Sequence, residues 1–269
     1  MADVAVHQTL RGVAIGYVAA LVIVPVAMVA WRTVQAGADT FWQAISSAQA
    51  VAAFRLTAIV AGSAVAINVI FGVGMALLLA RYRFPGRRLL AVLVDAPVSV
   101  SPIVVGLALV LAYGPREGWL GAPLQNAGIE LIYATPGMIA ATAFVTTPLV
   151  LREIVPVLAA EGMESDYAAR ALGATATQRF WRITLPTVRS ALAYGVVLSL
   201  ARAIGEFGAV KVVSGNVSGA GQTQTATLLV DERIEQLEPG GYQVSLVLIA
   251  VAVLAIVIVS ALQSRQETP

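Results

Sequence analysis

Two charged side chains, Arg202 and Glu206, stand four positions apart in the otherwise apolar stretch "ARAIGEFGAV". At this spacing they share one face of a helix, so the guanidinium and the carboxylate can pair. Charges inside a membrane span are rare and often functional. We predict that this pair neutralises itself and fixes its helix, with a contact between Arg202 and a passing anion as the alternative. Asp95, near another apolar window, is expected to cap it or to pair with an arginine of the preceding loop.

Hydroxyl side chains lie just before two prolines: Ser99 and Ser101 before Pro102, and Thr146 and Thr147 before Pro148. Proline frees backbone groups in a membrane helix, and nearby hydroxyls can satisfy them. Hydroxyls can also stabilise an anion weakly enough to release it, unlike a cluster of fixed cations. We predict the first role for these four residues and keep a place on an anion pathway as the alternative.

The composition excludes several kinds of chemistry. The chain has no cysteine, so thiol nucleophiles, disulfides and cysteine-ligated metals are impossible. The one histidine, His7, lies in a polar leader, so we expect no metal site and no histidine-based catalysis. The only lysine, Lys211, follows Val210 where a nucleotide-binding P-loop needs glycine. We therefore expect a chain that is not itself an enzyme and that binds no cofactor.

The elements that must position these residues are membrane helices. Of the 269 residues, 58% are hydrophobic and 12% charged, about half the charged share of a soluble domain. About 20 apolar residues are needed to cross a bilayer. Windows of this kind cover residues 12–31, 56–80, 89–113, 136–158, 188–210 and 244–263. The sequence predicts an all-α, polytopic membrane protein with six transmembrane helices in one domain, residues 1–269. A short interfacial helix after Trp31 and an amphipathic piece near Leu228–Leu237 are also expected.

Arginine and lysine between the spans predict the orientation. One side holds Arg11, Arg81, Arg83, Arg87, Arg88, Arg152, Arg170, Arg179, Arg182, Arg189 and Arg265. The other holds Arg32, Arg55, Arg116, Lys211 and Arg233. The richer side is expected to be cytoplasmic, which places both termini and the loop 159–187 there. The net charge of +2 thus reflects loop topology, and no nucleic-acid partner is expected.

The loop 159–187 carries the signals of a helical hairpin. Acidic residues from Glu161 to Asp166 open a helical pattern, and Arg170 and Gly173 close it. A second helical piece is expected from about Thr175, ended by Pro186 at the membrane surface. The hairpin leaves apolar side chains without a partner: Leu172, Phe180, Trp181 and Ile183. From the residues alone, docking to a cytoplasmic protein and lying on the bilayer surface are equally supported.

The spacing in this loop resembles the EAA loop of ATP-binding-cassette importer permeases. The matching residues are Ala168, Ala169, Gly173, Ile183, Leu185 and Pro186. The resemblance implies a type I importer permease whose loop forms the coupling helix seated in a groove of an ATPase subunit. The family's glutamate falls on Tyr167, and Asp166 and Glu164 lie near enough to substitute for it.

Four longer stretches look like the sulfate, thiosulfate and molybdate branch of these permeases. They are "NVIFGVGMALLLARYRFPGRR", "DAPVSVSPIVVGLALVLAYG", "ATPGMIAATAFVTTPLVLREIVPVL" and "ARAIGEFGAVKVVSGN". The resemblance implies import of sulfate or thiosulfate across a bacterial inner membrane, with molybdate or tungstate as the alternative. It also implies an ATPase dimer that binds ATP and Mg, a second, paralogous permease, and a periplasmic or lipid-anchored sulfate-binding protein. A secondary carrier that needs no ATPase is less favoured, because the sequence shows neither repeated halves nor a relay of ionisable residues in mid-membrane.

Overall fold

The computed structural model describes residues 2–115, 118–217 and 223–264, which contain helices and no strand. Arg116 and Arg265, which entered the predicted orientation, lie outside these residues. The first helices are α1 (Ala2–Gln35), α2 (Ala38–Ser46), α3 (Ala48–Arg81), α4 (Arg87–Ser99), α5 (Pro102–Tyr113), α6 (Gly121–Asn126) and α7 (Thr135–Glu161). They are followed by α8 (Glu164–Ala171), α9 (Ala176–Arg179), the π-helical turn η1 (Phe180–Thr184), α10 (Leu185–Ile204), α11 (Gly208–Ser214), α12 (Ala226–Glu235) and α13 (Gly241–Ser264). The predicted all-α class is confirmed.

Five segments of the described chain are long and apolar enough to cross a membrane: α1, α3, α7, the run from α9 through α10, and α13. Helices α4 and α5 pass the same test as a pair, with a bend of 112° between them. If the pair is one span, the number is six, as expected. The third window is therefore bent, because a residue before proline avoids the helical conformation and Ser101, with φ −59° and ψ 133°, lies outside the helical region. The side on which the termini lie stays a prediction.

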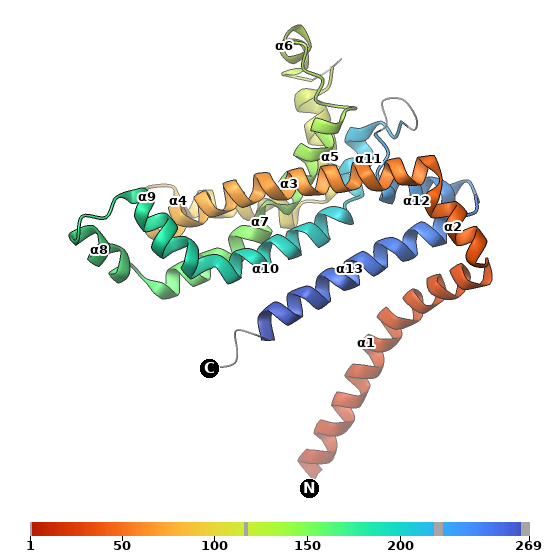
Figure 1. The fold of residues 1–269 in the computed structure, drawn as a ribbon, viewed down its shortest axis with the longest axis horizontal. Helices are drawn as coiled ribbons and strands as arrows, with labels where there is room; N and C mark the ends of the chain where they lie inside the picture. Colours follow the sequence, from red (N-terminus) through yellow and green to blue (C-terminus); the bar gives the residue numbers. More distant parts are fainter. Residues whose placement is uncertain (1, 116–117, 218–222, 265–269) are drawn as a thin grey trace.

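Helices α3 and α7 lie side by side at the centre of the bundle (Figure 1). Helix α10 packs against both, α13 packs on α10, and α5 packs on α11. One buried cluster joins α7 to α3, α5 and α11: Val60, Val105, Met138, Val145 and Val213. A second joins α7 to α3, α4 and α10: Ala76, Val94, Val150, Ile154 and Val188. Apolar side chains thus hold α7 at both of its ends.

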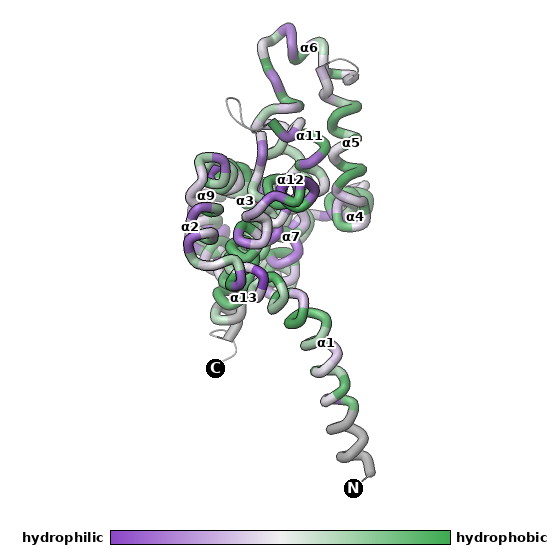
Figure 2. The backbone as a smooth tube through the Cα atoms, turned by 90° about the vertical axis from the view of Figure 1, so that its right-hand side faces the viewer, coloured by the Kyte–Doolittle hydropathy of each residue, from purple (hydrophilic) through white to green (hydrophobic). Residues whose placement is uncertain are grey.

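Helix α1 leaves the bundle and packs on α13 (Figures 1 and 2). No residue of its most apolar window is buried within the chain. Such a surface is stable only against apolar surroundings, which suits contact with membrane lipid. Helix α2, with Trp42 exposed, is the short helix expected after Trp31, and α12 is the amphipathic piece expected near Leu228.

The prediction that Pro186 ends the second helix of the loop is wrong. Helix α9, the turn η1 and α10 form one continuous run of 29 residues, Ala176–Ile204. At its π turn the Leu185 N–H bonds to the Phe180 carbonyl, five residues back. Pro186 follows in the first turn of α10, where the altered hydrogen-bond register accommodates its missing N–H. The fifth apolar window also ends earlier than residue 210, because the helix stops at Ile204.

Gly106 allows α5 to lie directly on α11. A Cβ atom there would stand 2.8 Å from the Ala209 carbonyl oxygen and 2.8 Å from the Val212 Cβ. We expect Gly106→Val to push the helices apart and to destabilise the subunit by about 1–3 kcal/mol. A lowered Tm in detergent would measure this. The control is Gly74→Val in α3, where nothing lies within 4 Å of the added atom. Equal losses in both variants would contradict the close approach.

Candidate functional site

The hairpin predicted in the loop forms between α7 and α10. Helix α8 carries Glu164 and Asp166 in its first turn and Arg170 in its last, charges that stabilise the two ends of a helix. Gly173 follows with a φ of +82°, which side chains with a Cβ rarely adopt. The expected end of the first helix is confirmed.

Thr175 begins the second helix of the hairpin with a capping box. Its hydroxyl accepts a hydrogen bond from the Gln178 N–H, and the Gln178 side chain accepts one from the Thr175 N–H. These bonds satisfy two donors that a helix start leaves free. The start near Thr175 is therefore confirmed, and it is fixed by residues adjacent in sequence.

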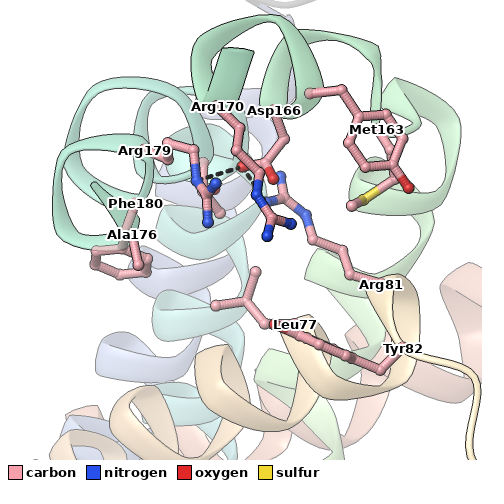
Figure 3. Close-up of a pocket in the computed structure, with 11 residues that line it drawn as sticks. Leu77, Arg81, Tyr82, Met163, Asp166, Arg170, Ala176, Arg179 and Phe180 are labelled. Carbon is pink, nitrogen blue, oxygen red and sulfur yellow. Dashed lines mark hydrogen bonds and ion pairs between the residues drawn. The ribbon is translucent and has the colours of Figure 1, made fainter. Parts of the chain in front are cut away.

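Asp166 fastens this hairpin to α3. Its Oδ1 accepts a hydrogen bond of 3.3 Å from Arg81 Nη1 and lies 3.3 Å from Arg179 Nε. Arg81 is the last residue of α3 and Arg179 the last of α9, so one carboxylate connects three helices (Figure 3). All three side chains are largely buried, which makes their ion pairs stronger than surface pairs.

The burial of Asp166 between two arginines changes the role expected for it. A buried carboxylate between two arginines is poorly placed to replace the family's glutamate at a contact with another subunit. Glu164 is exposed and remains the acid available for such a contact. Tyr167, at the glutamate position itself, is 60% exposed.

The other residues that match the EAA loop are distributed from the hairpin to the start of the membrane helix α10. Ala168 is exposed and Ala169 half-buried on α8, while Ile183 lies in the π turn and Leu185 and Pro186 open α10. The side chains of Leu172 and Trp181 are 89% and 61% exposed. The hairpin therefore presents an apolar surface that the rest of the described chain does not cover.

Arg202 and Glu206 form the predicted ion pair, with 2.7 Å between Nη1 and Oε2. Glu206 lies in the break between α10 and α11, and its Oε1 accepts a hydrogen bond of 3.0 Å from the Ala209 N–H. The Glu206 side chain is 1% exposed, whereas that of Arg202 is 41% exposed. The carboxylate thus caps α11 from inside the protein, and the guanidinium remains partly accessible.

Asn68, in α3, is a candidate that the sequence analysis missed. Its Nδ2 donates to Thr146 Oγ1 at 2.7 Å and to the Ala143 carbonyl at 3.0 Å. Its Oδ1 accepts from Thr147 Oγ1 at 3.1 Å. An amide alone in the apolar stretch "AVAINVIFG" was the available signal. Asn68 and Thr147 are also the polar lining of an apolar pocket of about 290 Å³ between α3, α4 and α7.

The four hydroxyl candidates are therefore not equivalent. Both threonines donate to carbonyls four residues back and contact α3 through Asn68. Ser99 and Ser101 instead lie exposed at the bend between α4 and α5. The threonines join two helices, and the serines remain the more accessible hydroxyls.

Replacing Asn68 by alanine is expected to loosen α3 from α7 by about 0.6–1.7 kcal/mol, as for other interhelical hydrogen bonds in membranes. The cost stays modest because Thr146 and Thr147 keep their carbonyl acceptors within α7. Unfolding of the purified subunit in detergent measures it. Ile67→Ala, at a 49% exposed neighbour, is the control. A loss no larger than in this control would show that the amide contributes nothing.

The remaining charges pair between helices. Asp95 Oδ1 accepts a hydrogen bond of 2.9 Å from Arg152 Nε of α7, so the expectation of a cap or a loop partner is wrong. Asp95 lies in the middle of α4, which packs against α7, so its partner comes from α7 and not from the preceding loop.

Lys211 Nζ lies 2.7 Å from Asp231 Oδ2 and joins α11 to α12. Its hydrogen bond to Asp231 raises the pKa of Lys211. The described residues hold no cluster of side chains able to ligate a metal.

Five helical segments, or six with the bent pair α4–α5, that are long and apolar enough to cross a membrane define the class of multi-pass membrane proteins. The chain belongs to the family of binding-protein-dependent transport system inner membrane components, whose model matches residues 68–268. It is 41% identical to the sulfate transport system permease protein CysW of Synechococcus elongatus over 257 residues, 95% of this chain and 89% of the relative. It is 35% identical to the sulfate transport system permease protein CysT of Escherichia coli, over 94% of this chain and 91% of the relative.

The fold is also similar to a solved structure. A bacterial alginate ABC transporter, crystallised with an alginate-bound periplasmic protein, matches with a TM-score of 0.72. The match covers 98% of this chain and 94% of the other at 19% identity. At this identity the likeness concerns the fold, and it supports the permease architecture expected from the loop.

Proposed function

We propose that this chain is the permease subunit of an ATP-driven importer that carries sulfate or thiosulfate into a bacterial cell. The observation that carries the proposal is the identity of 41% with a CysW sulfate permease over 95% of this chain. At that identity and coverage the comparison extends through the spans and the hairpin, and is not confined to one motif.

The other subunits supply what this one lacks. ATP and Mg bind to a dimer of separate ATPase subunits, and the permease holds no cofactor and performs no catalysis. A second, paralogous permease completes the pathway, which the similarity to both CysW and CysT proteins supports. A periplasmic or lipid-anchored sulfate-binding protein delivers the anion.

The hairpin couples the permease to the ATPase. Its exposed apolar side chains, Leu172 and Trp181, enter a groove of the ATPase with Tyr167 beside them. A movement of α8 is passed to α3 through the ion pair between Asp166 and Arg81. A movement of α9 is passed along the continuous helical run to Ile204, toward Glu206. One route is a buried ion pair, and the other is a helical run that continues through the π turn η1.

The anion passes near Arg202. Its guanidinium is 41% exposed, and its pairing with Glu206 leaves the site with no net charge. The exposed guanidinium attracts a dianion, the paired carboxylate weakens that attraction, and hydroxyls such as Ser99 and Ser101 add weak hydrogen bonds. This arrangement favours passage over tight binding.

Uptake of radiolabelled sulfate tests the proposal in a strain that lacks its own sulfate permeases. The chain, expressed with its neighbouring subunits, should restore uptake, and excess unlabelled sulfate or thiosulfate should compete better than molybdate. Preferred uptake of molybdate would assign the chain to the alternative substrate. Transport of sulfate in liposomes without the ATPase subunit would exclude an ATP-driven importer and favour a secondary carrier.

A further inference from the structure

A pocket of about 390 Å³ lies where the hairpin meets the end of α3 (Figure 3). Its charged lining consists of three arginines, Arg81, Arg170 and Arg179, and one carboxylate, Asp166. They come from three helices: Arg81 from α3, Asp166 and Arg170 from α8, and Arg179 from α9. Figure 3 shows the guanidinium groups gathered around the carboxylate.

Asp166 does not satisfy this group of cations. A single oxygen, Oδ1, meets both Arg81 and Arg179 at 3.3 Å. The Nε donor of Arg81 is buried and makes no hydrogen bond in the described residues, and the Nε of Arg179 has only its ion pair with Asp166 at 3.3 Å. Buried cationic donors are costly without acceptors, and one carboxylate cannot balance three positive charges.

We propose that this pocket binds a tetrahedral oxyanion of the sulfate or phosphate class. Such an anion presents several acceptor oxygens, and guanidinium groups bind them with strong, charge-assisted hydrogen bonds. The pocket is open to the surface and exceeds the size of one such anion. Its position at the hairpin makes the anion an additional tie between α3, α8 and α9. The inference does not rest on the proposed substrate, because none of these residues belongs to the Arg202 pathway, although Asp166 and Arg81 also form part of the proposed coupling route.

Equilibrium dialysis with radiolabelled sulfate measures the binding directly, using the full chain in detergent free of phospholipid at constant ionic strength set with chloride. Wild-type protein should bind sulfate saturably. Arg179→Gln should weaken the affinity about tenfold or more, because one charge-assisted hydrogen bond is lost. Arg182→Gln, one turn further along the same helical run and outside the pocket, should leave it unchanged.

Asp166→Asn gives a test that a purely structural role would not pass. Without sulfate this variant should melt at a lower temperature than wild type, because two arginines lose their carboxylate. It should nevertheless bind sulfate more tightly, and sulfate should raise its Tm more than that of wild type. Weaker binding in Asp166→Asn, or equal binding in Arg179→Gln and wild type, would overturn the proposal.

Two further arms identify the source of the anion and separate it from the transport site. Adding phosphatidylcholine, which carries a phosphate but no net charge, to the phospholipid-free detergent should lower the affinity for sulfate only if a lipid phosphate occupies the pocket, and should leave it unchanged if the occupant is a free anion. Either result supports an oxyanion pocket. Arg202→Gln should retain this binding, whereas loss of all sulfate binding in Arg202→Gln would place the anion on the pathway and contradict the pocket.

Discussion

Gly173→Val is expected to lower sulfate transport strongly while the subunit remains in the membrane. Gly173 adopts a φ of +82°, and nothing lies within 4 Å of an added Cβ, so the cost comes from the backbone alone. A residue with a Cβ in this region loses about 1–3 kcal/mol, and a β-branched one lies at the upper end. The turn between α8 and α9 would open, and coupling would fall by about tenfold or more. Sulfate uptake and the ATPase activity of the reconstituted complex measure this.

Two controls isolate the turn from general effects of mutation. Gly173→Asn should retain most activity, because asparagine tolerates positive φ better than other residues. Gly62→Val lies in α3, where an added Cβ meets nothing within 4 Å, and should change little. Membrane levels of all three variants should match wild type on an immunoblot. Unchanged uptake in Gly173→Val would show that the hairpin does not couple the permease to its ATPase.

The second large effect is expected at the Arg202–Glu206 pair, and it should be asymmetric. Arg202→Met leaves a carboxylate that is 1% exposed without its cation, which costs about 3–5 kcal/mol. Glu206→Gln leaves the arginine, which is 41% exposed, and the amide oxygen can still accept from the Ala209 N–H. Solvent screening lowers that cost to about 1 kcal/mol. Denaturation of the purified subunit should rank the variants in this order.

The double variant Arg202→Met/Glu206→Gln distinguishes the two roles of the pair. It removes both charges and should regain much of the stability that Arg202→Met loses. If the pair only fixes the helix, transport should return with stability. If Arg202 meets the anion, the double variant should fold and still fail to transport sulfate. Equal destabilisation by both single variants would refute the asymmetric burial.

Local signals predicted the hairpin well. The helix charges and Gly173, from which the hairpin was predicted, act within a few residues, and the Thr175–Gln178 capping box, which the sequence analysis did not name, acts over the same short range. The apolar windows predicted the membrane helices for a similar reason, because each window must contain a whole span. The bend at Ser101 was foreseen only as an irregularity beside proline, since its angle depends on how α5 packs on α11.

Contacts between distant residues could not be predicted. Asp95 pairs with a residue 57 positions away and Asn68 with one 78 positions away, and neither neighbourhood indicates its partner. Asp166 was expected to be available on the hairpin surface in place of the family's glutamate. It is buried instead, because it pairs with Arg81 of α3, which lies 85 positions earlier in the chain. The prediction that Pro186 ends a helix is wrong because the π turn before it accommodates the missing N–H of proline. Such a turn has no simple sequence signature.

The π turn at Phe180–Thr184 also affects how the two ends of its helical run are rotated relative to each other. An α-helix turns about 100° per residue, and a π turn is equivalent to one extra residue within the helix. The rotational alignment between the hairpin and the Arg202–Glu206 pair therefore depends on this turn. Removing one residue from the π turn would leave a regular α-helix with its two ends in nearly the same rotational alignment, because the wider turn absorbs the extra residue. Removing a residue elsewhere in the run from Ala176 to Ile204 would instead swing one end about 100° around the axis relative to the other.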